Sequence, residues 1–182
     1  QFDKVELIKV VKPETGYDEL EAMLANAEKV LQLLGLHYRV LLLSSGDMGF
    51  AAAKTYDIEV WAPGQGSYLE VSSVSNTEDF QSRRMKTRFK AEQGGNQLPH
   101  ILNGSGVALA RLFVALIETY QQADGSISIP KPLQSYLRAD RIVGILSISI
   151  VGPRRNSPRR AAFTRPIVLV TRGEHKRCRS TT

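Results

Sequence analysis

A glycine-rich segment followed by an apolar helix carries the first residues that could do chemistry. Asn103-Gly-Ser-Gly predicts a flexible, hydroxyl-bearing turn at the surface. The chain from Val107 to Tyr120 predicts a helix with one buried face, because apolar residues recur at three- and four-residue spacing: Leu109, Leu112, Phe113, Leu116, Ile117 and Tyr120. Arg111 lies in the first turn, where the helix dipole favours anions, so it could bind a phosphate or carboxylate. It could equally extend into solvent.

A second group of candidate residues lies on two neighbouring strands. Residues 54–61 and 67–73 alternate in polarity and are joined by a short glycine-rich connection, which is typical of an antiparallel hairpin. Asp57, Glu59 and Glu70 are then carboxylates on adjacent strands. Taken alone, each is an ordinary outward residue of a half-buried sheet.

A third group lies near the start of the chain. The alternating segment from Phe2 to Val11 predicts a strand, with Phe2, Lys4, Glu6 and Ile8 on one face. An aromatic ring, a cation and a carboxylate on one side of a sheet could form the floor of a binding site. A half-exposed strand with solvated charges would show the same pattern.

The elements between these groups would hold them in place. A capped helix is expected from Thr15 to about Leu34, where Gly35 would end it. Its apolar stripe is Tyr17, Leu20, Leu24, Ala27, Leu31 and Leu34. The chain from His37 to Ser44 is expected to form a buried strand, and Leu98 to Leu102 another.

A segment with several positive charges follows the hairpin. Ser75-Asn-Thr supplies helix-capping residues, and the helix that they predict continues into five basic side chains: Arg83, Arg84, Lys86, Arg88 and Lys90. This basic face could approach RNA, or it could be solvated as most such faces are. Residues 91–97 are expected to form a loop.

Composition excludes several classes of protein. The 182 residues are 42% hydrophobic, which suits one globular domain, and no apolar run is long enough to span a bilayer. A single cysteine excludes an internal disulfide and fits a reducing compartment, so we expect a cytoplasmic protein. Three scattered histidines disfavour a zinc site. The first residues resemble neither a signal peptide nor an initiating methionine, so we expect a piece of a longer protein.

The net charge of +6 comes from the end of the chain. Residues 153–182 hold nine of the 24 Lys and Arg residues but one of the 18 Asp and Glu residues. We therefore expect residues 143–182 to be a basic, poorly ordered tail. It could be an RNA-binding extension. Alternatively, it could be sequence never selected to fold with this domain, such as read-through or out-of-frame translation, and we favour this reading.

The residues of these motifs, taken in order, also resemble those of a known protein family. The segment Asn103-Gly-Ser-Gly-Val-Ala-Leu-Ala-Arg111 and the helix after it resemble motif 3 of the class II aminoacyl-tRNA synthetases, in the form carried by seryl-tRNA synthetases. Gln1-Phe-Asp-Lys-Val-Glu6 resembles the strand after motif 2, and Ser75-Asn-Thr-Glu-Asp-Phe-Gln-Ser-Arg-Arg84 also follows the family pattern. The resemblance extends from Gln1 to about Tyr136. The family usually has glycine at the position of Ala110.

The resemblance implies a role for each matched residue. Arg111 would neutralise the γ-phosphate of ATP, and Phe2 would stack on its adenine. Glu70-Val-Ser-Ser73 matches the segment that binds ATP in the family. Within this segment, Glu70 and Ser73 would hold Mg²⁺. Val71 and Ser72 would be their neighbours in the ATP site. Glu6, Asn103 and Ser105 would bind the serine substrate. A regular strand places Glu70 and Ser73 on opposite faces, so their shared role requires a bulge or a strand end.

The resemblance also implies the fold and the reaction. We expect an α+β fold, an antiparallel sheet flanked by helices, with residues 1–142 forming part of a class II synthetase catalytic core. The reaction would be activation of L-serine with ATP and transfer to tRNA(Ser). The family's tRNA-binding hairpin, its dimer-forming motif 1 and its motif 2 would precede Gln1, which leaves the activity of this chain open. Family members form homodimers through the absent motif 1, and no membrane association is expected.

Two other functions fit the same residues. A relative without the tRNA-binding arm could load an amino acid onto a carrier protein. A non-catalytic fragment with a basic RNA-binding tail is the third possibility. Residues encoded upstream of Gln1 would discriminate the first two, and binding of a seryl-adenylate analogue would test the third.

Overall fold

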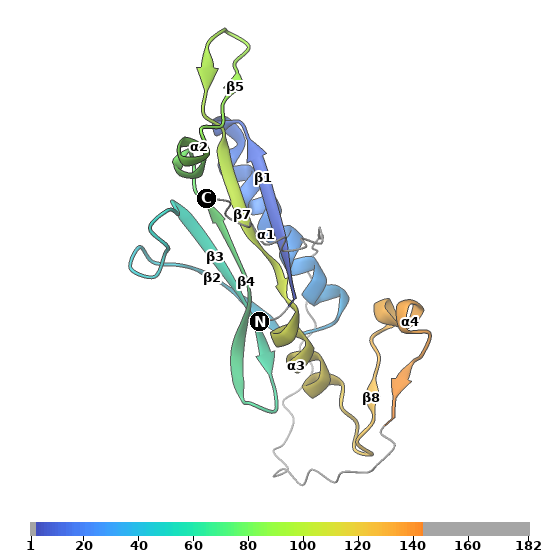
Figure 1. Cartoon of the computed structure of the whole chain (residues 1–182). Coiled ribbons are helices and arrows are strands. Elements are labelled where there is room, and N and C mark those ends of the chain that lie inside the picture. Colours follow the sequence, from blue (N-terminus) through green and yellow to red (C-terminus); the bar gives the residue numbers. More distant parts are fainter. Residues whose placement is uncertain (1–2, 144–182) are drawn as a thin grey trace, which may run out of the picture.

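A five-stranded antiparallel sheet forms the centre of the structure, a computed structural model that describes residues 3–143 (Figure 1). The strands lie in the order β1-β7-β4-β3-β2, and each pair of neighbours is antiparallel. Their bounds are β1 Lys4–Val11, β2 Tyr38–Leu42, β3 Lys54–Ala62, β4 Ser67–Asn76 and β7 His100–Ala108. The expected antiparallel sheet with flanking helices is therefore confirmed, and so is the β3–β4 hairpin.

Helix α1 (Gly16–Leu33) covers one face of this sheet and completes the core. Its stripe is buried as predicted from Leu20 to Leu34, with Met23 added, and Gly35 at φ +65° ends the helix. The predicted start is wrong in two details. Tyr17 is 44% exposed, because its hydroxyl reaches out to Glu78. Thr15 is the N-cap residue of α1, as expected, but its side chain makes no capping hydrogen bond, because a 3₁₀ turn, η1 (Pro13–Thr15), precedes α1 and the threonine hydroxyl donates to the Lys12 carbonyl.

The expected surface turn at Asn103-Gly-Ser-Gly is wrong, because these residues form the middle of β7, between β1 and β4. The glycines serve close packing and not flexibility. A Cβ atom on Gly104 would lie 2.5 Å from the Ser73 carbonyl oxygen, and one on Gly106 would lie 3.0 Å from a Val5 methyl. The turn was expected because glycine suits both a tight turn and a strand that another backbone approaches closely.

Helix α3 (Leu109–Tyr120) follows β7 directly, as the motif predicted. Its predicted buried face is partly wrong, since Leu109 and Phe113 are 40% and 60% exposed while Leu112 and Ala115 are buried. The helix packs beside β3 and β4 along one narrow stripe only, so the wider apolar face is not covered by the described residues. Within residues 3–143 no helix is both long and apolar enough to cross a membrane.

Strand β2 is shorter and less buried than predicted. It runs from Tyr38 to Leu42, and Leu42 is 61% exposed. The physical reason is its place in the sheet, because β2 is the outer strand and pairs with β3 alone among the described strands. A run of leucines is compatible with a fully buried strand, but it does not reveal the position of that strand in the sheet.

The segment after β4 forms helix α2 (Phe80–Met85), which starts later than predicted. Ser75 and Asn76 belong to the end of β4 and do not cap α2. The expected loop at residues 91–97 is the tip of a small hairpin of β5 (Phe89–Lys90) and β6 (Asn96–Gln97), which projects from one end of the molecule in Figure 1.

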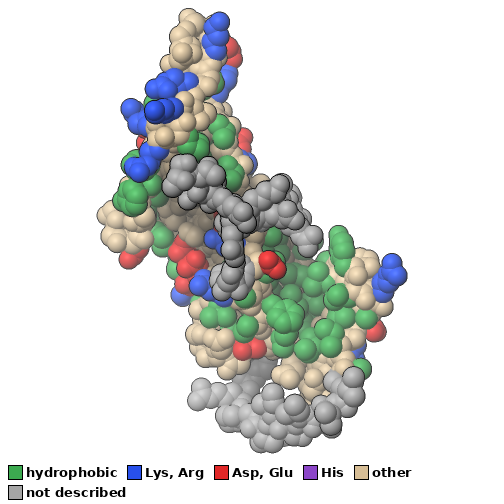
Figure 2. Space-filling model, viewed as in Figure 1, with side chains coloured by type: hydrophobic (Ala, Val, Ile, Leu, Met, Phe, Trp, Pro, Cys, Tyr) green, Lys and Arg blue, Asp and Glu red, His purple; other side chains and the backbone are tan. Residues whose placement is uncertain are grey.

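The described chain ends in a small unit beside α3. It contains β8 (Ile127–Ser128), α4 (Lys131–Leu137) and β9 (Arg141–Ile142), and β8 pairs with β9. Figure 2 shows hydrophobic side chains gathered over this side of the molecule. The exposed ones of α3, α4 and β9 are Leu109, Phe113, Tyr136, Leu137 and Ile142. Phe2 and the predicted basic tail from residue 144 lie outside the described residues, and the domain boundary at 142 stays a prediction.

The close approach of β7 and β4 gives a test of the strand assignment. Gly104→Ala should lower the free energy of unfolding by about 1–3 kcal/mol, because the new methyl group would overlap the Ser73 carbonyl and the Val74 side chain. Urea denaturation measures this change. Gly46→Ala is the matched control, since its nearest neighbouring atom is 4.0 Å away, and it should be nearly neutral. Equal effects of the two substitutions would contradict the packing role.

Candidate active site

A cavity of about 320 Å³ opens on the sheet face away from α1. Its floor comes from β3, β4 and β7, and its rim comes from α2 and the loop between β2 and β3. Side-chain alternation explains this arrangement. Ile58 and Val60 of β3 point into the core with α1, so Asp57, directly before Ile58, points the other way. The polar lining is Asp47, Thr55, Asp57, Glu70, Ser73, Ser75, Thr77, Gln81 and Asn103.

A β-bulge in β4 brings the two predicted metal-binding residues to this cavity. Ile58 pairs with Ser72 and Glu59 pairs with Glu70, so Val71 is the extra residue. The extra residue shifts the alternation by one, which places Glu70 and Ser73 on the same face. Both line the cavity. The bulge that a shared role of Glu70 and Ser73 requires is therefore present.

The bulge directs the side chains of Val71 and Ser72 into the protein interior. Both are 1% exposed, Val71 belongs to the hydrophobic core, and the Ser72 hydroxyl donates to the Ser105 carbonyl. Neither residue lines the cavity. A role for them in nucleotide binding would therefore have to use their backbone atoms.

Arg111 reaches from the first turn of α3 to the bulge. Its Nη1 donates a 2.8 Å hydrogen bond to the Glu70 carbonyl oxygen and lies 3.8 Å from Glu70 Oε1. The guanidinium has five N–H donors, and its side chain is 48% exposed, so further donors face solvent. Arg111 is thus anchored at the edge of the site, and it can still bind an anion.

The three predicted serine-binding residues lie on the adjacent strands β1 and β7. Asn103 lines the cavity, and its Nδ2 donates to Gln81 Oε1 of α2 at 3.0 Å. Ser105 follows on the same face of β7, is 8% exposed, and pairs across the sheet with Glu6 of β1. Glu6 also forms a 2.7 Å ion pair with Lys4. Glu6 and Ser105 are outside the cavity lining, next to its Asn103 end.

Asp57, one of the three hairpin carboxylates to which the sequence assigns no role, also lines the cavity. It lies on β3 directly opposite Ser73, and its Oδ1 is buried without a hydrogen-bond partner among the described residues. The register of the hairpin could have indicated this neighbour of Ser73. Its unpaired state could not have been predicted, because it depends on which groups the surrounding chain brings near.

These residues fit a magnesium ion. Mg²⁺ takes oxygen ligands and usually binds one or two carboxylates together with phosphates and water. Glu70, Ser73 and the unpaired Oδ1 of Asp57 offer such oxygens on one surface. No group of three or more His, Cys, Asp or Glu side chains arranged to hold a metal occurs among residues 3–143, so a ligand phosphate would have to complete the coordination.

Charges on α2 flank the rim of the cavity. Arg83 donates to Asp79 one turn earlier, and this hydrogen bond holds the pKa of the Asp79 carboxyl below its usual value. The same contact raises the pKa of Arg83. Arg84 stacks over the ring of Phe80, 5.5 Å from its centroid. Two of the predicted basic residues therefore have partners on the protein.

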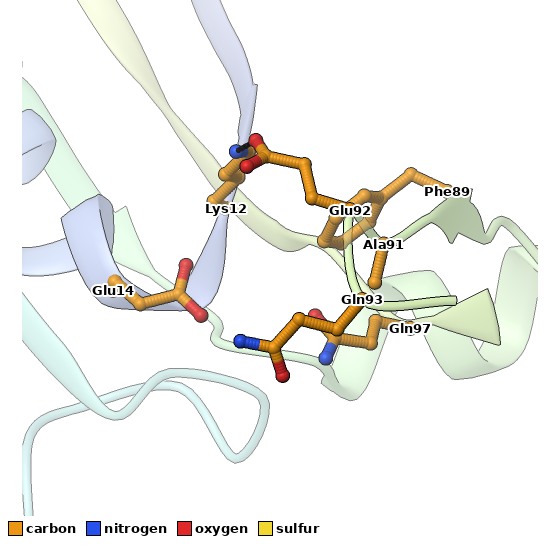
Figure 3. A pocket seen from close by; sticks show the side chains of 7 residues that line it. All are labelled: Lys12, Glu14, Phe89, Ala91, Glu92, Gln93 and Gln97. Carbon is orange, nitrogen blue, oxygen red and sulfur yellow. Dashed lines mark hydrogen bonds and ion pairs between the residues drawn. The ribbon is translucent and has the colours of Figure 1, made fainter. Parts of the chain in front are cut away.

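A second cavity, of about 220 Å³, lies between η1 and the β5–β6 hairpin (Figure 3). Lys12 and Glu92 form an ion pair across it, which raises the pKa of Lys12 and lowers the pKa of Glu92 through their hydrogen bond. The other side chains at its wall include Glu14, Phe89 and Gln97. The pair joins the hairpin to the end of β1, and it satisfies both charges without a ligand.

The sequence matches known proteins over most of its length. Residues 1–120 match the family model of the tRNA synthetase class II core domain (G, H, P, S and T). The chain is 63% identical over 142 residues to a serine-tRNA ligase of Akkermansia muciniphila, covering 78% of this chain and 33% of the relative. It is 59% identical over 137 residues to that of Neisseria meningitidis serogroup C, covering 75% and 32%.

Solved structures show the same likeness. The seryl-tRNA synthetase of Pyrococcus horikoshii complexed with ATP matches with a TM-score of 0.77 and 41% identity, over 80% of this chain and 33% of that one. The cytoplasmic serine-tRNA ligase of Naegleria fowleri in complex with AMP matches with a TM-score of 0.72 and 33% identity, over 78% and 34%. This chain spans about a third of the length of these relatives. Its fold, its motifs and its family match place this chain in the tRNA synthetase class II core domain family, over a region that it shares with serine-tRNA ligases.

Proposed function

We propose that this chain contributes an ATP site and a serine site to a serine-tRNA ligase. The observation that carries the proposal is the bulge at Val71, which directs Glu70 and Ser73 into one cavity while Arg111 is anchored on the Glu70 carbonyl. The relatives with ATP and AMP bound have the same fold over most of this chain, which supports a nucleotide as the ligand.

The residues around the cavity suit the activation of an amino acid. In that reaction a carboxylate attacks the α-phosphorus of ATP and pyrophosphate leaves, so catalysis depends on positioning and on neutralising phosphate charge. Arg111 would bind the γ-phosphate through its free N–H groups. Glu70 and Ser73 would hold Mg²⁺, which when bound would offset phosphate charge. Phe2, outside the described residues, would stack on adenine.

Serine would bind beside the phosphates, along β7. Glu6 would pair with the ammonium group of the substrate, and Ser105 with Asn103 would hydrogen-bond its amino and hydroxyl groups. A site that offers hydrogen-bonding groups to a substrate hydroxyl rejects analogues that lack it, because those groups are then left unpaired. The positions of Glu6 opposite Ser105 and of Asn103 at the cavity support this arrangement.

The partners of the whole enzyme follow from the relatives. The activated serine would be transferred to tRNA(Ser), and the complete protein would act as a cytoplasmic homodimer. Helix α2 contributes Gln81 to the cavity rim and carries Arg83 and Arg84, so its basic side chains support this rim as the place where the end of a tRNA would enter. These statements concern a protein about three times as long as this chain.

The proposal predicts that the chain binds a non-hydrolysable seryl-adenylate analogue. This ligand fills both parts of the site, so its binding does not depend on turnover. Isothermal titration calorimetry measures the affinity. Failure of the folded 182-residue chain to bind the analogue would leave it without a ligand site of its own and would refute the proposal for this chain.

Arg111→Ala should weaken ATP binding about 10- to 100-fold, because a hydrogen bond to a charged group contributes about 1.5–3 kcal/mol. Calorimetric titration with ATP measures the loss, and circular dichroism checks the fold. Arg39→Ala is the control, since Arg39 forms its ion pair with Glu59 away from the cavity lining. Unchanged ATP affinity in Arg111→Ala would remove this arginine from the site.

Ser105→Ala should reduce the preference for seryl- over alanyl-adenylate analogues about tenfold, while ATP affinity stays unchanged. The reason is that the variant loses the hydroxyl that would pair with the serine side chain, a contribution of about 1–1.5 kcal/mol. Competition titrations with the two analogues give the ratio. An equal loss of affinity for both analogues and for ATP would show a structural role for Ser105 instead.

A further inference from the structure

Asp57 is one of the polar residues of the cavity to which the proposed function gives no role. Its side chain points into the same space as Glu70 and Ser73, and Ser73 is its direct partner across the β3–β4 hairpin. Directly opposed side chains on one face of an antiparallel pair have Cβ atoms about 4.5–5.5 Å apart. A ligand that contacts the Ser73 hydroxyl is therefore within reach of the Asp57 carboxylate.

The neighbours of Asp57 do not satisfy its buried oxygen. The hydroxyls of Thr55 and Ser75, the next pair on the same face, hydrogen-bond to each other at 2.8 Å. The Asn103 amide is bonded to Gln81. Oδ1 of Asp57 is thus a shielded acceptor with no donor among residues 3–143. Buried carboxylate oxygens are normally paired, and one that is not calls for a cation or an ordered ligand.

The distribution of charge favours a cation. On the same face of the hairpin, the pair after Asp57 and Ser73 is Glu59 opposite Glu70, so two neighbouring pairs on this face hold three carboxylates. Glu59 is held by Arg39, and Glu70 lies beside Arg111. Asp57 has no such basic partner among the described residues. A divalent cation between Asp57, Ser73 and Glu70 would relieve the repulsion and supply the missing partner.

We propose that Asp57 is a third protein ligand of the magnesium site, binding the ion through Oδ1 beside Glu70 and Ser73. The inference rests on the proposed function, because the remaining coordination positions would be filled by phosphate oxygens and water. Two carboxylates and one hydroxyl agree with the few protein ligands that Mg²⁺ normally takes in nucleotide sites.

Binding of Mn²⁺, followed by electron paramagnetic resonance, tests this role. Mn²⁺ is a suitable probe because it prefers the same carboxylate, hydroxyl and water ligands as Mg²⁺. The titration is run on the 182-residue chain with and without a non-hydrolysable ATP analogue. Asp57→Asn keeps the shape of the side chain and removes its charge, and it should weaken Mn²⁺ binding about 10- to 100-fold.

Asp47→Asn is the matched control. Asp47 lines the same cavity and loses the same charge in this variant, but its Oδ2 already accepts a hydrogen bond from Ser44. Its Mn²⁺ affinity should stay close to that of the unaltered chain. Asp57→Ala serves as a second variant, because it removes the buried oxygen altogether and does not place an amide there. Both Asp57 variants should also lose the rise in melting temperature that Mn²⁺ gives to the unaltered chain.

The outcomes separate this inference from the proposed function. Unchanged Mn²⁺ affinity in the Asp57 variants would overturn the inference, and so would an unaltered chain that binds the ATP analogue but never binds Mn²⁺. In both cases the ATP site would stand. Equal weakening by Asp47→Asn would show a general effect of charge and would also overturn it. An unaltered chain that binds neither the ATP analogue nor the seryl-adenylate analogue would instead refute the proposed function.

Discussion

The extra residue at Val71 is the constraint on which the arrangement of the site depends. In a regular strand Glu70 and Ser73 would face opposite sides of the sheet, and the cavity would lose one of them. The bulge gives both side chains to the cavity and turns Val71 and Ser72 inward, where they stabilise the core and fix the Ser105 carbonyl. Arg111 then bonds to the backbone at the same place. A single local irregularity therefore connects the residues proposed to bind the metal, the phosphates and serine.

The elements with strong periodicity could be predicted from the sequence. Helix α1 shows a regular stripe that the sheet buries, and the β3–β4 hairpin shows clear alternation around a glycine-rich connection. Burial on α3 was harder to predict, because its apolar residues exceed what the described sheet covers and Phe113 is 60% exposed. The strand predicted at Leu98–Leu102 is found as the first part of β7, but its continuation through Gly104 reads as a turn, because a glycine carries no information about which backbone will approach it.

The candidate site could be predicted only in part. Glu70, Ser73, Asn103 and Arg111 were found through their motifs, and the structure brings all four to the cavity or its edge. Asp57 is recognised in the sequence only as an ordinary strand carboxylate, because what distinguishes it is the lack of a hydrogen-bond partner for its Oδ1 among the described residues. A carboxylate on an alternating strand has the same local pattern whether it meets solvent, an arginine or an ion. Only the full set of neighbours, with Thr55 and Ser75 bonded to each other, reveals the difference.

The close packing of Gly104 against the Ser73 backbone affects how the proposed site would bind its ligands. Gly104 lies between Asn103 and Ser105, so the strand that presents both side chains is locked against β4 before any substrate arrives. If serine binds as proposed, little conformational entropy would be lost on binding, and the geometry that would discriminate among substrates would already exist in the free protein. Discrimination of this kind comes from a rigid template, which does not reshape itself around a wrong side chain.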